Sequence, residues 1–223
     1  MKKLMDIDIA DIVPFSKGII VARKDVLKSG KTKISFFTYD VKLERPTAST
    51  RSVYMLSKFG EKYEEIEKQL SDFIYCDAAI LPNKHVAVAY TSGEIGLFND
   101  KGQLYWTGDL NYKNSPISGV VSEGKYLWCV VPENNCIVRY SPTTEKIVLR
   151  IGGDSSTAFL NPVSLSLYDD TLYICNYQSC KIRTVNLKNF SVADYKTFEE
   201  PVFRYIKTND RELVELESGV YML

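Results

Sequence analysis

The chain has 223 residues, of which 45% are hydrophobic and 25% are charged. This composition is ordinary for a globular protein and excludes a disordered or collagen-like chain. The 28 Lys and Arg residues balance the 28 Asp and Glu residues, so the net charge of zero offers no overall basic footprint for nucleic acid or an anionic membrane.

The N-terminus begins with Lys2 and Lys3 like a signal peptide, but the acidic residues Asp6, Asp8 and Asp11 interrupt the apolar stretch that such a peptide needs. The longest apolar run, 126–131, is far shorter than the ~20 residues that span a bilayer. The sequence therefore predicts a soluble, cytoplasmic protein without membrane contact.

Five cysteines are present, and a chain of this length does not need disulfides to fold, so reduced thiols are expected. The sequence has one histidine, His85, and no Cys-x-x-Cys pair. A zinc site is therefore not expected. We predict neither a metal nor a cofactor.

A short motif recurs along the chain: a polar or small residue or Val, then Pro, then an apolar residue. Its copies are Val13-Pro14-Phe15-Ser16, Ser115-Pro116-Ile117-Ser118, Asn161-Pro162-Val163-Ser164 and Glu200-Pro201-Val202-Phe203, and a copy without Pro fits at Ile74-Tyr75-Cys76-Asp77. Three of the four spacings between neighbouring copies are close to the about 40–45 residues of a four-stranded propeller blade.

The first segment, 2–12, precedes the first marker and is predicted to be a single strand without a sheet of its own. Residues 23–33 follow, with five basic residues around Ser29-Gly30. They are interpreted as an extended hairpin tip. A solvated loop is favoured there over a contact with phosphate or an acidic protein.

Residues 42–73 are predicted to be an insertion that contains a short helix. Tyr63, Ile66, Leu70 and Phe73 recur at helical spacing between charged residues, as on an amphipathic helix. We expect the helix to pack over the link between the first two blades, and a partner-docking helix is the alternative.

After each later marker come an apolar stretch, a turn and strongly β-prone strands such as 126–131 and 172–177. The last marker, Pro201, leaves room for only three strands, whereas the N-terminal strand has no sheet. Ring closure solves both problems, with 4–9 pairing against 220–223 and leaving no open edge. The sequence therefore predicts an all-β fold in one domain, 1–223: a five-bladed β-propeller closed by the N- and C-terminal strands in one blade.

Residues 152–185 resemble an NHL-type propeller repeat. The matching residues are Gly152-Gly153, Phe159, Asn161-Pro162, the Asp169-Asp170 turn, Leu172-Tyr173-Ile174, Asn176 and Lys181-Ile182. The resemblance implies a propeller. Members of that class bind proteins, RNA or sugars, and some hydrolyse or isomerise small molecules, so the fold alone selects no function.

The innermost strand of a propeller blade lines the central channel, and we expect that strand to follow each marker. The residues two positions beyond the markers are Ser16, Asp77, Ser118, Ser164 and Phe203, and Lys17 and Arg204 follow one residue later. These seven residues are the predicted ligand-binding site at the channel mouth. No catalytic residue is predicted, because one acid does not make a glycosidase pair and His85 lies a turn away from the channel strand.

The predicted function is a non-catalytic binding module for protein–protein interaction through the loops and the channel mouth. Its expected partner is a protein, or a small polar ligand or sugar, and no nucleic acid. Tyrosines in turns and loops, Tyr90, Tyr112, Tyr140 and Tyr177, suit a protein interface. A lectin is one alternative, and a lactonase-like or glycosidase-like hydrolase or isomerase at the channel is the other. Converging acids or a bound metal in the channel would favour the enzyme. The oligomeric state stays open.

Overall fold

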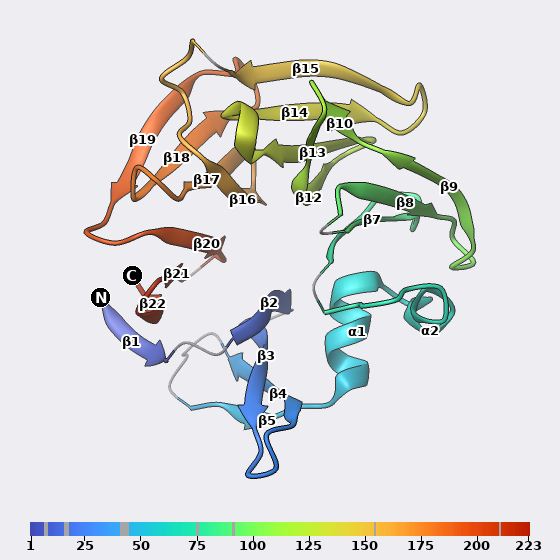
Figure 1. Cartoon of the computed structure of the whole chain (residues 1–223), viewed down its shortest axis with the longest axis vertical. Helices are drawn as coiled ribbons and strands as arrows, with labels where there is room; N and C mark the ends of the chain where they lie inside the picture. The colour runs from blue at the N-terminus through green and yellow to red at the C-terminus, as the bar shows by residue number, and fades with distance from the viewer. Residues whose placement is uncertain are drawn as a thin grey trace.

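The computed structural model describes residues 1–6, 9–15, 18–40, 45–74, 76–90, 92–153, 155–209 and 211–223. Five four-stranded antiparallel sheets and one two-stranded hairpin account for the strands of these segments. The sheets stand around a central axis as the blades of a propeller (Figure 1), so the predicted five-bladed fold is confirmed. Blades I to V are numbered in chain order.

Within each blade the strands run outwards from the axis (Figure 1). The innermost strands are β2 (Ile9–Phe15), β6 (Asp77–Ile80), β12 (Ser118–Glu123), β16 (Pro162–Tyr168) and β20 (Val202–Lys207). The second strands are β3 (Gly18–Val26), β7 (Val86–Ala89), β13 (Tyr126–Val131), β17 (Thr171–Asn176) and β21 (Glu212–Leu216). The third strands are β4 (Thr32–Asp40), β8 (Glu94–Phe98), β14 (Cys136–Ser141), β18 (Lys181–Asn186) and β22 (Gly219–Met222). The outermost strands are β5 (Thr47–Ala48), β9 (Leu104–Asp109), β15 (Lys146–Gly152), β19 (Val192–Thr197) and β1 (Lys2–Met5).

Blade V is shared by the two ends of the chain. Its strand order is β1-β22-β21-β20, and Lys2 pairs with Met222 and Lys3 with Tyr221 in antiparallel register. The predicted closure by the terminal strands is therefore confirmed. The N-terminal segment is not one strand, however, because β1 ends at Met5 and β2 begins a new blade at Ile9.

Each of the five interfaces between blades holds its own hydrophobic cluster. Successive side chains of a strand point to opposite faces of its sheet, so a strand buried on both faces serves two clusters. In β13, Leu127 and Cys129 pack towards blade II, whereas Trp128 and Val130 pack towards blade IV. The uninterrupted apolar sequences of β7 and β13 follow from this double burial.

Two helices, α1 (Arg51–Phe59) and α2 (Tyr63–Glu67), fill the link between blades I and II (Figure 1). The Thr50 side chain accepts a hydrogen bond from the Val53 N–H and caps the start of α1, and Gly60, at φ 78°, ends it. The predicted helix within 61–73 is shorter than its periodicity indicated. Leu70 and Phe73 pack on the same cluster as α1 without being helical.

The first marker differs from the others, because Pro14 lies near the end of the innermost strand instead of at its start. The prediction that the channel strand follows the marker is therefore wrong for blade I. Pro116 also lies outside a channel strand, in the hairpin of β10 (Asn111–Tyr112) and β11 (Ser115–Pro116). A 3-10 helix, Pro132–Asn134, links β13 to β14.

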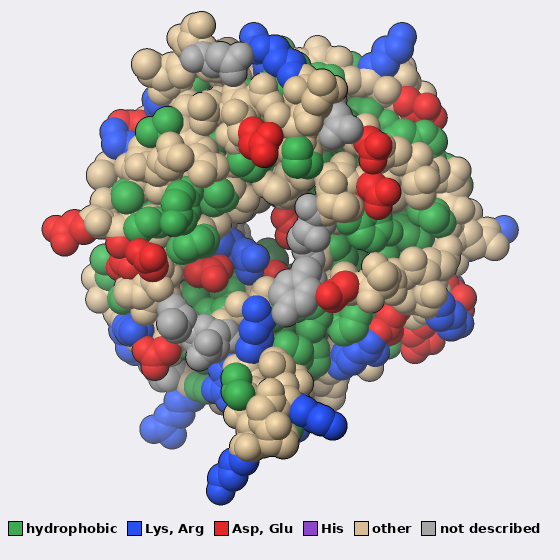
Figure 2. All heavy atoms as spheres, in the orientation of Figure 1, with side chains coloured by type: hydrophobic (Ala, Val, Ile, Leu, Met, Phe, Trp, Pro, Cys, Tyr) green, Lys and Arg blue, Asp and Glu red, His purple; other side chains and the backbone are tan. Residues whose placement is uncertain are grey.

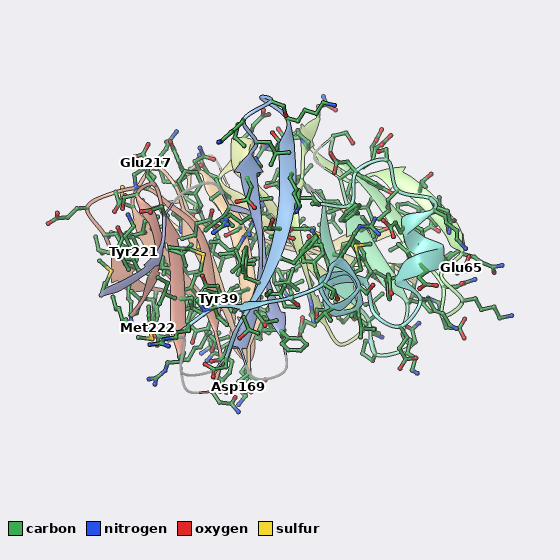
Figure 3. The ribbon with its side chains drawn as sticks, turned by 90° about the horizontal axis from the view of Figure 1, so that it is seen from below. Tyr39, Glu65, Asp169, Glu217, Tyr221 and Met222 are labelled. Carbon is green, nitrogen blue, oxygen red and sulfur yellow. The ribbon has the colours of Figure 1, made fainter. Side chains whose placement is uncertain are left out.

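None of the five cysteines, all of them described, forms a disulfide, and four of them are buried. In the described segments, no helix has the length and apolar content needed to cross a membrane. Figure 3 shows the ring edge-on, with Glu217 labelled towards one face and Asp169 towards the other. We call these the Glu217 face, where the innermost strands begin, and the Asp169 face, where they end.

Candidate functional site at the central channel

The central channel contains a cavity of about 390 Å³ whose wall combines the innermost strand of every blade with residues of α1. Figure 2 shows the opening at the centre of one face, with acidic and basic side chains beside it. Near its start each innermost strand contributes one residue to the wall: Asp11, Asp77, Val120, Ser164 and Arg204.

Asp11 is buried, and both of its carboxylate oxygens contact neighbouring groups. Oδ2 accepts hydrogen bonds from the Tyr54 hydroxyl and the Lys58 ammonium group, each at 2.6 Å. Oδ1 accepts one from the Ile12 N–H at 2.9 Å and lies 3.0 Å from Arg204 Nη1. Burial by itself raises the pKa of Asp11, but Lys58 and Arg204 outweigh it and hold that pKa below its usual range. Asp11 is therefore an ionised structural anchor, held by three hydrogen bonds and the ion pair with Arg204.

Lys58 is brought to the channel by α1, one turn after Tyr54. Its Nζ donates to Asp11 Oδ2, to Tyr54 Oη at 3.0 Å and to the Ile74 carbonyl at 3.2 Å. These three acceptors use all three N–H groups of the ammonium. Burial, and then Asp11, raise the pKa of Tyr54, so its hydroxyl keeps the proton that it donates.

Arg204, in β20, joins two acids. Its Nη1 lies 3.0 Å from Asp11 Oδ1 and 3.8 Å from Oε2 of Glu215, its partner across the β20–β21 ladder. Burial lowers the pKa of Arg204, but Asp11 and Glu215 outweigh this effect and raise it. Burial raises the pKa of Glu215 in spite of the neighbouring guanidinium group. The positive charge of Arg204 is thus committed to these two acids.

Asp77, at the start of β6, is the acid on the cavity wall that lacks a direct cationic partner among the described residues. None of the described residues places a Lys, Arg or His nitrogen within 4.0 Å of its carboxylate. It accepts a hydrogen bond from the Val120 backbone N–H of blade III, and burial raises its pKa. A Cβ on Gly119 would lie 3.1 Å from Asp77 Oδ2, so a glycine at this position gives the carboxylate room.

The serine hydroxyls of the wall are oriented by contacts between blades. Ser164 Oγ donates to the Phe203 carbonyl of blade V at 2.6 Å, and Ser122 Oγ donates to the Ile80 carbonyl of blade II at 2.8 Å. Because each hydroxyl has one proton, both present lone pairs to the cavity. Ser166 Oγ is buried and has no hydrogen-bond partner among the described residues.

The structure brings three of the seven sequence-predicted site residues to the cavity wall: Asp77, Ser164 and Arg204. Ser118 lies on the innermost strand β12 and Phe203 on the innermost strand β20, but neither is part of that wall. Ser16 and Lys17 lie outside the described residues. The binding role of all seven stays a prediction.

Asp11 and Lys58 are among the channel-wall residues that the sequence analysis missed. Asp11 was assigned to an outer strand. Lys58 belongs to a helix that Thr50 and Gly60 signal as N-cap and C-terminal glycine. Tyr54 and Lys58 lie four residues apart between Thr50 and Gly60, a spacing that puts both side chains on one face of the helix. This spacing could have identified the buried face.

Of the tyrosines expected on the surface, Tyr140 is buried in the core between blades II and III. His85 lies apart from the channel and contacts Tyr105 at 3.4 Å. Among the described residues, no three His, Cys, Asp or Glu side chains come together as a metal site.

No protein-family model matches this sequence, and no curated protein matches it either, so the NHL resemblance is not confirmed. Solved structures do share the fold. A streptogramin B lyase aligns with a TM-score of 0.59 at 10% identity, over 98% of this chain and 94% of the other. A catalytically inactive virginiamycin B lyase from Staphylococcus aureus, solved with quinupristin, aligns with a TM-score of 0.57 at 12% identity, over 95% and 79%. The computationally designed Ika4 protein aligns with a TM-score of 0.51 at 12% identity, over 66% and 88%.

At these identities the similarity shows the fold alone. The chain is a β-propeller with five blades, and its structural neighbours include a lyase and a designed protein. Its function must therefore be argued from its own channel.

Proposed function

We propose that this propeller is a non-catalytic binding module that holds a small polar ligand in its central channel. Asp77 carries the proposal. A carboxylate that serves only the fold is paired, as Asp11 is, because a desolvated unpaired charge costs stability. Asp77 lines a cavity of about 390 Å³ without a cationic partner among the described residues, and burial raises its pKa. Perturbed groups of this kind concentrate at functional sites.

The hydrolase alternative needs a second carboxylate that is free to act. Asp11 and Asp77 share the cavity, and their pKa values move in opposite directions, as in an acid and base pair. However, three hydrogen bonds and the ion pair with Arg204 hold the carboxylate of Asp11 in place. Its lowered pKa makes it a weak base, so Asp11 is poorly suited to act on a substrate. Asp11 and Asp77 resemble a catalytic dyad, but the structural role of Asp11 favours a binding function of the channel over hydrolysis.

A thermal-shift screen with a library of small cationic, neutral and anionic polar compounds tests the proposal. We expect at least one compound to raise the melting temperature of the wild type but not that of Asp77→Asn. Asp169→Asn is the matched control, because Asp169 is an exposed acid on a turn outside the channel wall, and this variant should respond like the wild type. Compounds that stabilise Asp77→Asn equally, or a library without any stabilising compound, would contradict it.

Asp77→Asn is also expected to stabilise the free protein at pH 7. The raised pKa means that the folded state binds the Asp77 proton more tightly than the unfolded state does, so stability falls as the pH rises from the unfolded pKa through the folded one. Asparagine removes this penalty and still accepts the Val120 hydrogen bond. Urea unfolding across pH 4–8 should show an advantage of the variant that shrinks as the pH falls. A variant less stable than the wild type at pH 7 would show that Asp77 serves the fold.

A protein partner is the second candidate, and a different surface favours it. Leu160 and Phe203 are 45% and 39% exposed near the starts of β16 and β20, and Phe203 packs edge-on against Tyr177 with ring centroids 5.3 Å apart. Exposed aromatic and aliphatic side chains on one face of the ring suit a protein contact. Phe203→Ser should weaken such a contact and leave ligand binding in the channel unchanged, since Ser164 bonds only the backbone of Phe203.

A further inference from the structure

We infer that the channel cavity selects a small organic cation, a protonated amine that pairs with Asp77. This inference rests on the proposed ligand-binding function and names the chemical class of the ligand.

The cations around the cavity contact other groups. Lys58 and Arg204 both contact Asp11, and Arg204 Nη1 also lies 3.8 Å from Glu215. Lys207 donates to Tyr173 Oη at 3.2 Å and lies 4.0 Å from Glu212, which Lys196 pairs with at 2.6 Å. Lys58 and Arg204 act on Asp77 only from beyond 4.0 Å, so Asp77 has no direct cationic partner among the described residues. A ligand with one positive charge can pair with it directly.

The neutral groups of the wall also favour a donor. Ser122 and Ser164 each donate their single proton to a backbone carbonyl and can only accept further hydrogen bonds. Asp77, when ionised, is an acceptor as well, and Lys58 has used its three N–H groups. Arg204 Nη1 is the exception, since it makes no hydrogen bond among the described residues, but its charge lies beside Asp11 and Glu215. An ammonium group has donors and no acceptor, so it is complementary to the acceptors near Asp77. Ser166 Oγ, buried on the same wall without a hydrogen-bond partner among the described residues, is a further polar atom that a ligand could satisfy.

The size of the cavity and its number of acids favour an organic cation over a metal ion. A volume of about 390 Å³ equals the space of about a dozen water molecules, at about 30 Å³ each, and is far more than an ion fills. Calcium takes 6–8 oxygen ligands, often from several carboxylates. Among the described residues no group of three acidic, His or Cys side chains converges. One carboxylate with a few neutral acceptors matches a primary amine.

The test compares ligands of one shape and three charges. Benzylamine, benzyl alcohol and benzoate are titrated into the full chain at pH 7 by calorimetry, and n-butylamine, n-butanol and butyrate form a second series without the ring. We expect the amine to bind at least ~10-fold more tightly than its alcohol and its carboxylate in the series that fits the cavity. Asp77→Asn should lose this preference, and Asp169→Asn should keep it.

The dependence on pH adds a second readout. Protonation of Asp77 removes its charge, so the affinity for the amine should fall as the pH is lowered. The affinity for benzyl alcohol should not fall with it. Tighter binding of benzoate, or equal binding of the amine to wild type and Asp77→Asn, would overturn the inference. If an alcohol or a carboxylate binds in an Asp77-dependent manner and the amines do not, the ligand class is wrong and the channel site stands. If neither these series nor the polar library binds, both proposals fail.

Discussion

Lys58→Met is expected to destabilise the protein by about 3–5 kcal/mol, because removing one partner of a buried ion pair leaves the other partner uncompensated. Asp11 would keep Arg204 and Tyr54 but lose a cation at 2.6 Å, and the Ile74 carbonyl would lose its contact with the ammonium group. Methionine has a similar length and good helix propensity, so α1 itself should persist. Urea unfolding at pH 7, with the slope checked for two-state behaviour, measures the difference.

The matched control is Lys68→Met, which removes an exposed lysine that pairs with Glu65 at 3.0 Å on the surface. Surface pairs of this kind contribute about 0–1 kcal/mol, so the two substitutions should differ clearly. The double variant Asp11→Asn with Lys58→Met should cost less than the sum of the single variants, because the two side chains act as one unit. A loss below about 1 kcal/mol for Lys58→Met would show that the contact does not hold the blades together.

The pH dependence of this difference has a defined sign. The pKa of Asp11 is lowered in the folded state, so its contribution is present above the unfolded value of about 3.9 and is lost as the pH falls through the folded value. The gap in stability between wild type and Lys58→Met should therefore narrow in acid. A gap that stays constant down to the acid transition would mean that the ammonium group acts through packing instead of through the charge of Asp11.

The number of blades was predictable from the sequence because each blade repeats the same local pattern. Turns and β-prone runs follow the markers in blades II to V, and the missing strand of blade V could be counted. Local propensity and global fold agree in these blades, which is the usual condition for a sequence to specify its structure. The same agreement explains why the closure by β1 and β22 could be predicted before their register was known.

The channel wall was predicted only in part, because the marker lies at different distances from the wall residue in different blades. Val120, Ser164 and Arg204 each follow an extra residue in the ladder between the first two strands. Ser164 is two residues after its marker, whereas Arg204 is three and Val120 is four residues after theirs. A fixed offset of two therefore reaches the wall at Ser164 but stops short of it at Ser118 and Phe203.

The contact between Asp11 and Lys58 spans 47 residues and joins a strand to a helix of the insertion. No local sequence pattern predicts a contact between residues so far apart, although the strand and the helix that carry them can each be predicted. The helix in 61–73 is shorter than predicted for a different reason. The apolar spacing reflects burial of these side chains against the cluster between blades I and II. The helix itself ends at Glu67, and beyond it the Gln69 side chain donates to the carbonyls of Glu65 and Gly102.

Deleting residues 1–6 is expected to give a protein that aggregates or is destabilised by several kcal/mol, although no wall residue is removed. This segment carries β1, which is the outermost strand of blade V and pairs with β22. Without it, the edge of β22 exposes unpaired backbone groups, and each lost hydrogen bond costs on the order of 1 kcal/mol. A longer deletion, to residue 12, would be ambiguous because it also removes Asp11 and the start of β2.

The apolar contacts of β1 add to this loss. Leu4 and Met5 pack on the cluster between blades V and I, which includes Leu213 and Val220. Lys3→Ser is the matched control: it removes an exposed side chain and its surface pair with Asp6 but keeps the backbone pairing, so its melting temperature should stay close to that of the wild type. A synthetic peptide of residues 1–6, supplied in excess, should raise the melting temperature of the truncated protein, because a free sheet edge accepts an added strand. A truncated protein that melts within about one degree of the wild type, and ignores the peptide, would show that the ring is held closed by the blade interfaces without its fourth strand.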